Sequence, residues 1–129
     1  MEKKINIILI DHQQLFREGV KRVLQAEESF HVVVSSDDYS VVPQLISVNQ
    51  IDVLLIDINI FMQYKQQMKE EVLEQKPEIK VIVLSSEGEE NYVTEAVRLG
   101  IHGYLLKEMD IYSFVNECLT FIQLLRIVY

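Results

Sequence analysis

Apolar and polar residues alternate along this chain in blocks that predict five strands and five helices. Five short apolar runs are the strand candidates, at 5–10, 30–35, 51–57, 81–84 and 103–106. Helical spacing, capping residues and stop signals predict five helices. The first spans 13–26, the second follows the second strand and ends at about 48, and the others span 64–75, 89–99 and about 110 to the end. The central run 51–60 is the most apolar, and Asp57 stands where its strand should end.

Strands that alternate with helices in units of roughly 20 to 25 residues are typical of an α/β domain with a parallel sheet. Right-handed crossovers restrict the topology, and the doubly wound order 2-1-3-4-5 suits five strands. The 129 residues contain no linker, repeat or low-complexity stretch, so we expect one domain over 1–129.

Composition excludes several function classes. A net charge of -8 argues against direct contact with nucleic acid, since phosphates are bound by Lys and Arg. The single cysteine, Cys118, excludes an internal disulfide and fits a reducing, cytoplasmic setting. The first apolar run is too short for a signal peptide core or a membrane span, and it is better explained as a first strand.

Four polar residues come directly after, or at the ends of, predicted strands: Asp11, Asp57, Ser85 and Lys107. Taken singly, each is explained as a cap or a surface charge. Taken together, they place two carboxylates, a hydroxyl and an ammonium at the edge where parallel sheets bind ligands. Two carboxylates about 4 Å apart repel by roughly 4 kcal/mol at an effective dielectric near 20, so a metal ion or Lys107 must offset them. Such a site suits a phosphoryl group, with Asp57 as the nucleophile.

The sequence resembles the receiver domain of bacterial two-component response regulators (CheY-like, flavodoxin-like fold), closest to the NarL/FixJ (LuxR-type) subgroup. The resemblance covers essentially the whole chain. It is carried by 7–24, including LFREGV at 15–20, by 52–59, and by 81–108, including GYLLKE at 103–108.

The resemblance implies a role for each residue of the site. Asp57 would accept a phosphoryl group from the phosphohistidine of a sensor histidine kinase, and Lys107 would pair with Asp57 and then with the phosphoryl oxygens. Ser85 would hydrogen-bond the phosphoryl group, and Tyr104 would change rotamer to report this at the surface. Asp11, Asp57 and the main-chain carbonyl of Asn59 would together bind Mg²⁺.

The chain departs from the pattern of the family in two places. His12 stands where receivers carry a second acid, and imidazole should weaken Mg²⁺ binding considerably. The site would then bind Mg²⁺ weakly, bind a softer divalent ion, or bind no metal. We expect His12 itself to face solvent at the start of a loop. After Asp57 the chain lacks the usual Pro and Gly, so we expect a loop built without positive φ angles. The bulky Phe61, Met62 and Tyr64 either cover the site or pack the next helix against the sheet.

The last helix carries more apolar residues than one face can bury. We expect one stripe to seal the sheet, namely Ile111, Phe114, Val115, Cys118, Ile122 and Leu125. A second set lies off that stripe and suggests a partner surface: Leu119, Phe121, Leu124, Val128 and Tyr129. A homodimer through this helix, or through the face made by 89–99, 103–106 and the last helix, is one hypothesis. The resemblance also implies a C-terminal DNA-binding domain beyond this sequence, and DNA contact only through it.

Three functions compete. The favoured one is a phosphorylation-dependent receiver, not an enzyme, that regulates transcription through its output domain. The alternative is a pseudo-receiver that dimerises or docks proteins without phosphorylation. The third is a phosphatase with an aspartyl-phosphate intermediate, against which Asn59 stands where a general acid is needed two residues after Asp57.

Overall fold

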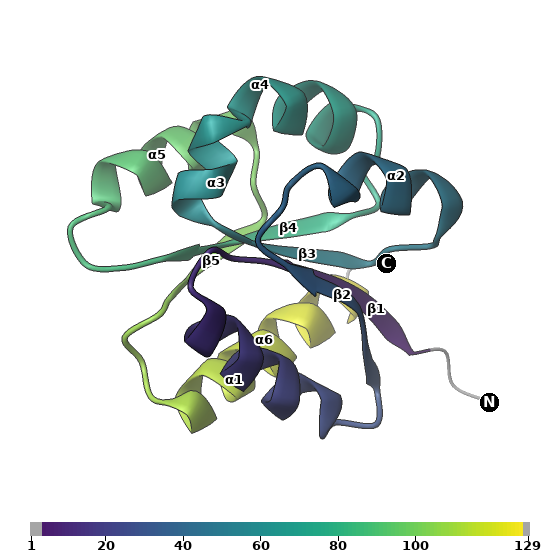
Figure 1. Ribbon diagram of the computed structural model, residues 1–129, viewed down its shortest axis with the longest axis vertical. Helices are drawn as coiled ribbons and strands as arrows, with labels where there is room; N and C mark the ends of the chain where they lie inside the picture. Colours follow the sequence, from purple (N-terminus) through teal and green to yellow (C-terminus); the bar gives the residue numbers. More distant parts are fainter. Residues whose placement is uncertain (1–3, 128–129) are drawn as a thin grey trace.

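A five-stranded sheet runs through the middle of the molecule, and helices cover both of its faces, as the computed structural model shows (Figure 1). The structure describes residues 4–127, and side chains up to residue 120. The strands are β1 (Ile5–Ile10), β2 (Phe30–Ser36), β3 (Val53–Asp57), β4 (Lys80–Ser85) and β5 (Gly103–Leu106). The helices are α1 (Gln14–Gln25), α2 (Val41–Val48), α3 (Ile58–Gln63), α4 (Lys65–Gln67), the π-helix η1 (Met68–Glu74), α5 (Glu90–Leu99) and α6 (Ile111–Ile127).

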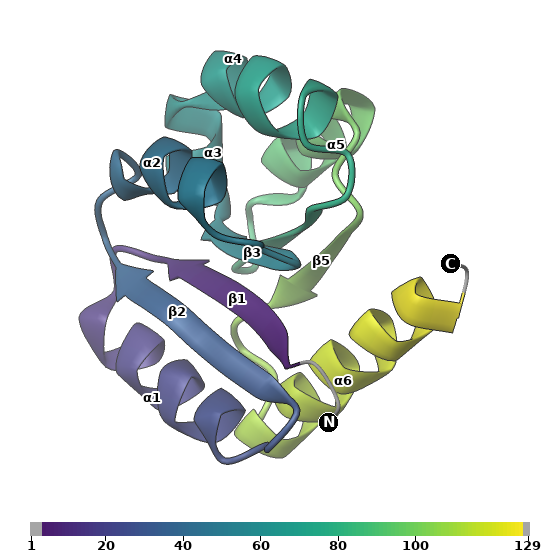
Figure 2. The same ribbon diagram turned by 90° about the vertical axis from the view of Figure 1, so that its right-hand side faces the viewer.

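The strand order is β2-β1-β3-β4-β5, and every neighbouring pair is parallel, which confirms the predicted doubly wound topology. In Figures 1 and 2, α1 and α6 lie on one face of the sheet, and α2 to α5 lie on the other. All strands therefore end at the same edge, where the crossovers to the next helices begin.

The third crossover differs from its prediction. The expected loop after Asp57 is wrong, because α3 begins at Ile58, immediately after β3 ends at Asp57. The helix predicted over 64–75 is the second half of a longer helical segment, which is interrupted at Tyr64 (φ -115°, ψ 29°). The structure thus has more helical segments than the five expected. No residue other than glycine has a positive φ within the described part of the chain, so the missing Gly after Asp57 causes no strain.

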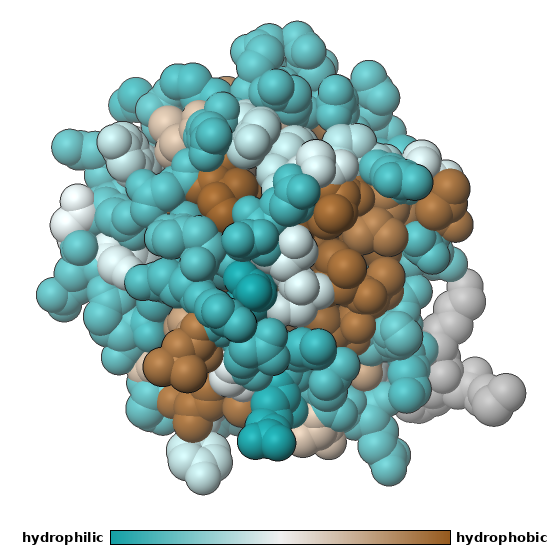
Figure 3. All heavy atoms as spheres, in the orientation of Figure 1, coloured by the Kyte–Doolittle hydropathy of each residue, from teal (hydrophilic) through white to brown (hydrophobic). Residues whose placement is uncertain are grey.

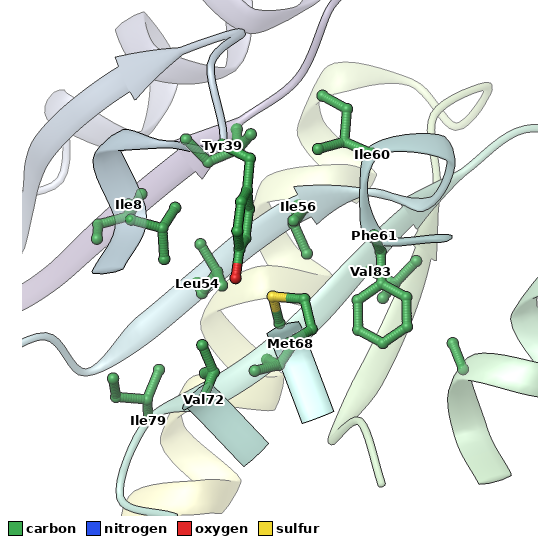
Figure 4. Close-up of a cluster of buried hydrophobic side chains, with 14 of the residues drawn as sticks. Ile8, Tyr39, Leu54, Ile56, Ile60, Phe61, Met68, Val72, Ile79 and Val83 are labelled. Atoms are coloured by element: carbon green, nitrogen blue, oxygen red, sulfur yellow. The ribbon is translucent and has the colours of Figure 1, made fainter. Parts of the chain in front are cut away.

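Two apolar clusters, one on each face of the sheet, form the core. The cluster under α2 to α5 contains Phe61 and Met68, both with no exposed surface (Figure 4). Met62 and Tyr64 are half-buried against the same cluster. These bulky side chains therefore pack the third crossover against the sheet, which was one of the two uses expected of them. Full burial of a side chain such as Phe61 stabilises the fold by about 2 kcal/mol or more.

Within the described side chains, helix α6 seals the other face with a set of residues that differs from the prediction. Phe114 and Cys118 are buried as expected, and burial raises the pKa of the Cys118 thiol to about 12. Ile111 was expected to be buried but is 39% exposed, whereas Leu119, expected to be exposed, packs against the core. The buried stripe of α6 is thus rotated towards Leu119. The direction of the helix axis over the sheet decides which side chains meet the core, and the periodicity of the sequence does not encode that direction. The predictions for the side chains of Phe121, Ile122, Leu124 and Leu125, and for Val128 and Tyr129, lie outside the described residues.

Apolar atoms also reach the surface. Figure 3 shows them gathered on the side of the molecule where Figure 1 places α2 and β2. In α2, Val41 and Leu45 are half-buried and Val48 is 74% exposed. A second set of exposed apolar or aromatic side chains lies on α5, β5 and α6: Tyr92, Val97, Tyr104, Leu106, Ile111 and Tyr112. Among residues 4–127, no helix has both the length and the apolar character that a membrane crossing requires.

Candidate functional site

Strand register brings the predicted site residues together at the carboxyl edge of the sheet. Ile10 pairs with Ile56, so the next residues, Asp11 and Asp57, lie on adjacent strands. Asp57 in turn pairs with Leu84, one residue before Ser85. Ser85 pairs with Leu106, one residue before Lys107, and the Lys107 N–H donates to the Ser85 carbonyl at 2.8 Å. Each of these four side chains is therefore positioned at the end of a strand or directly after it.

The Lys107 ammonium is the centre of the site. Its Nζ donates to Asp57 Oδ1 at 2.7 Å and to Gln13 Oε1 at 2.7 Å. It also forms an ion pair with Asp11 Oδ2, at a distance of 2.7 Å. The Lys107 side chain is 7% exposed, and the two carboxylates are almost fully buried. One buried cation therefore offsets the repulsion between two buried anions, as the sequence required.

The second oxygen of Asp57 caps helix α3. Asp57 Oδ2 accepts the main-chain N–H of Asn59 at 3.0 Å and that of Ile60 at 3.2 Å. A carboxylate is favourable at this position, because it satisfies free N–H groups at the positive end of the helix dipole. The capping by Asp57 is the reason that the chain turns directly from β3 into a helix without a loop.

His12 lies beside the same oxygen. Its Nδ1 is 3.2 Å from Asp57 Oδ2, while 54% of its side chain remains exposed. His12 thus faces solvent, as expected, and also contacts the candidate phosphoacceptor. His12 is thus the exposed member of this group, since Asp11 and Asp57 themselves have almost no exposed surface.

Asn59 is oriented differently from what a metal ligand requires. It presents its N–H to Asp57, and its side-chain Nδ2 donates to Glu89 Oε2 at 2.7 Å. Carbonyls in a helix point towards its C-terminus, away from the capped end. For the Asn59 carbonyl to bind an ion at Asp57, the first turn of α3 must open. Coordination by this carbonyl stays a prediction.

The resemblance to receiver domains implies Mg²⁺ at an acidic site, and Asp11 with Asp57 forms an acidic cluster here. The ligand atoms of Asp11, His12 and Asp57 all lie within 4.8 Å of one another. The third donor is a nitrogen, whereas Mg²⁺ demands oxygen ligands in a near-octahedral arrangement. The donor set is therefore a poor match for Mg²⁺.

Ser85 and Tyr104 line a cavity beside α5. Ser85 is 1% exposed, and its hydroxyl has no hydrogen-bond partner in the described structure. A small cavity of about 140 Å³ is lined by Ser85, Thr94 and Tyr104, among others. Tyr104 is 54% exposed at the mouth of this cavity. A buried hydroxyl without a partner carries a desolvation cost, so Ser85 is ready to bind a polar group that enters the pocket.

Three residues of the site were missed by sequence reasoning. Gln13 accepts a hydrogen bond from Lys107, and the Phe16 ring lies with its centroid 5.0 Å from Lys107 Nζ. Glu89 joins the start of α3 to the loop after β4, since it accepts from both Asn59 and the Ser86 N–H. The only sequence signal was proximity to predicted strand ends, because none of the three residue types is diagnostic by itself.

The sequence of this chain is similar to those of known proteins. Residues 7–118 match the protein family described as "Response regulator receiver domain". Among curated proteins, the chain is similar to the transcriptional regulatory protein DegU of Brevibacillus brevis, with 43% identity over 84% of this chain and 46% of DegU. It is also similar to the probable transcriptional regulatory protein NarL of Mycobacterium tuberculosis, with 31% identity over 90% of this chain and 55% of NarL. The chain spans about half the length of these relatives.

Solved structures of response regulators share the fold of this chain. The receiver domain of the putative response regulator NarL from Mycobacterium tuberculosis superposes with a TM-score of 0.72 at 26% identity, covering 95% of this chain and 98% of that one. A response regulator from Thermotoga maritima gives a TM-score of 0.77 at 18% identity over 93% of this chain and 98% of that one, a likeness of fold alone.

Proposed function

Because this chain belongs to the response regulator receiver domain family, we propose that Asp57 accepts a phosphoryl group from the phosphohistidine of a partner sensor kinase. The observation that carries the proposal is the position of the Lys107 ammonium, 2.7 Å from Asp57 Oδ1, with both side chains almost fully buried and the exposed His12 beside the other oxygen. A buried cation beside the carboxylate offsets its negative charge and stabilises the charge that arrives with the phosphoryl group.

In the transfer step, a carboxylate oxygen of Asp57 attacks the phosphorus atom in line with the bond to be broken. The P–N bond of the phosphohistidine breaks, and its electron pair returns to the imidazole nitrogen, which takes up a proton. The product is an acyl phosphate on Asp57. Lys107 then has phosphoryl oxygens as partners in addition to Asp11 and Gln13, which already lie within 2.7 Å of its ammonium.

The phosphoryl group would reorganise the side of the pocket that faces α5. It carries nearly two negative charges and three acceptor oxygens, so it attracts the unpartnered hydroxyl of Ser85. Movement of Ser85 changes the wall of the cavity that Tyr104 borders, and the Tyr104 ring turns inwards to fill it. The surface made by α5, β5 and α6 would then differ between the two states.

This surface is also where we place the partners. Exposed Tyr104, Leu106 and Tyr112 give it apolar character, which suits a second copy of the chain. The relatives named above are transcriptional regulators about twice as long as this chain. We therefore propose that phosphorylation, acting in the cytoplasm, controls a C-terminal DNA-binding domain. The chain would act as a signalling module and not as an enzyme on a separate substrate.

Intact-mass measurement after treatment with acetyl phosphate, with and without divalent ions, tests the proposal. The wild-type chain should gain one phosphoryl group, slowly or only with a metal ion present, and Asp57→Asn should gain none. Asn keeps an oxygen that can cap α3, so this variant should fold. Asp37→Asn, which removes an exposed carboxylate from the end of β2, is the matched control and should be labelled like the wild type.

A folded wild-type chain that neither acetyl phosphate nor beryllofluoride modifies under any metal condition would contradict the proposal. That result would assign the chain to phosphorylation-independent docking or dimerisation. Turnover of a phosphomonoester would instead indicate a phosphatase.

A further inference from the structure

The contact between His12 and Asp57 has the dimensions of a metal site. Two ligands at right angles, each about 2.1 Å from an ion, lie about 3.0 Å apart, and two opposite ligands lie about 4.2 Å apart. His12 Nδ1 and Asp57 Oδ2 are 3.2 Å apart, and all three candidate ligand atoms, with that of Asp11, lie within 4.8 Å of one another. The 3.2 Å between His12 Nδ1 and Asp57 Oδ2 is therefore close to the separation of two neighbouring ligands of one ion.

Charge and access at this position also suit a divalent cation. Asp11 and Asp57 bring two negative charges, and Lys107 supplies one positive charge, so the buried part of the pocket retains a net negative charge. Lys107 pairs with Asp57 through Oδ1 and with Asp11 through Oδ2. The other oxygen of Asp57 faces His12, whose ring is exposed.

The chemistry of the donors decides which ion fits. Two carboxylates and an imidazole make a mixed oxygen and nitrogen set, and the imidazole suits first-row transition metals rather than Mg²⁺. We propose that His12 Nδ1 is a direct ligand, with Asp11 and Asp57, of a divalent transition-metal ion, and that His12 makes the pocket prefer such an ion to Mg²⁺. The inference rests on the proposed function in placing the ion at the candidate phosphoacceptor.

Metal binding to the unphosphorylated protein separates the two proposals. Mn²⁺ alone is the probe, detected through its effect on water proton relaxation, with Mg²⁺ as the competitor. The wild type should bind Mn²⁺ and release it only to a large excess of Mg²⁺. His12→Ala should weaken Mn²⁺ binding about tenfold or more, since loss of even an outer partner of a metal ligand costs 10- to 100-fold. His12→Asp should shift the preference towards Mg²⁺ about tenfold, because oxygen replaces nitrogen.

Two controls make the result specific. His31→Ala removes another exposed histidine, at the start of β2 and away from the pocket, and should leave Mn²⁺ binding unchanged. In NMR spectra of the wild type, Mn²⁺ should broaden the ring signals of His12 at lower concentrations than those of His31.

The inference is overturned if the wild type binds no Mn²⁺, or if His12→Ala binds it as tightly as the wild type. It is also overturned if His12→Asp keeps the wild-type preference between the two ions. None of these readouts requires phosphorylation, so failure of phosphoryl transfer to Asp57 would leave the metal result intact.

Discussion

Lys107 Nζ lies 2.7 Å from Asp57 Oδ1, although the two residues are 50 positions apart in the chain. The pairing of β4 with both β3 and β5 creates this contact, because it sets the ends of the strands beside one another. The contact leaves the two acidic side chains of the pocket dependent on one cation.

Replacement of that cation should therefore cost stability. We expect Lys107→Met to lower the free energy of unfolding by about 3 kcal/mol, because removal of one partner leaves buried charges uncompensated. Urea denaturation at neutral pH measures the loss. Lys65→Met is the matched control, since Lys65 pairs with Glu95 where both side chains are more than 40% exposed. Its loss should stay below about 1 kcal/mol.

The double variant Lys107→Met/Asp57→Asn tests the cause of the loss. It should be more stable than Lys107→Met alone, because one of the unpaired charges is gone and the effects of contacting residues do not add. Equal stability of the single and double variants would mean that the ammonium stabilises the fold by packing alone.

The hydroxyl of Tyr39 points into the apolar cluster that contains Leu54 and Met68 (Figure 4) and has no hydrogen-bond partner in the described structure. Burial, with a smaller effect of Glu71, raises the pKa of Tyr39 to about 12. We expect Tyr39→Phe to stabilise the protein by about 1 kcal/mol, since it removes an unsatisfied buried group. It keeps the ring stack on Tyr64, with centroids 4.5 Å apart.

Thermal or urea unfolding measures this gain. Tyr112→Phe is the control, because Tyr112 is 80% exposed and its change should stay within about 0.5 kcal/mol. A marked loss of stability in Tyr39→Phe would show that the hydroxyl is hydrogen-bonded in solution.

Two glycines in helical segments should respond in opposite directions to alanine. Gly100, predicted from the sequence to stop α5, caps that helix with φ 106°. Gly100→Ala should cost about 1 kcal/mol, because this left-handed conformation disfavours a Cβ. Gly19 lies inside α1 with nothing within 4 Å of an added Cβ. Gly19→Ala should gain about 0.5 to 1 kcal/mol from helix propensity. A gain in both variants would contradict the left-handed cap at Gly100, and unfolding experiments decide this.

His102 should make stability depend on pH. Its Nδ1 accepts the Val81 N–H at 3.0 Å, and burial, together with the charge of Lys80, lowers its pKa below the usual 6.5. Above pH 6.5 the histidine is neutral in the folded and in the unfolded chain, so it causes no loss of stability. As the pH falls below 6.5, the unfolded chain takes up the proton first, so stability falls until the pH passes the lower pKa of the folded state.

Urea midpoints between pH 7.5 and 5 measure this effect. His102→Gln should show a weaker decline with falling pH than the wild type. His31→Gln, which changes an exposed histidine, should keep the wild-type decline. Identical pH profiles for His102→Gln and the wild type would show that other groups cause the decline.

The sequence by itself determined the elements and their order. The apolar runs predicted all five strands to within two residues, and the alternation with helices predicted the order 2-1-3-4-5. The positions of Asp11, Asp57, Ser85 and Lys107 after strands were enough to predict that they meet at one edge. These features follow from local periodicity and from general rules of parallel sheets, so they can be derived without coordinates.

Only the tertiary structure decided what each of these side chains contacts. The sequence did not show that Asp57 caps α3 with one oxygen and binds Lys107 with the other, or that the exposed His12 turns towards Asp57. It also placed Ile111 on the wrong side of the last helix. The physical reason is that contacts depend on strand register and on the angle at which each helix crosses the sheet. Both are set by packing between segments that are distant in the chain.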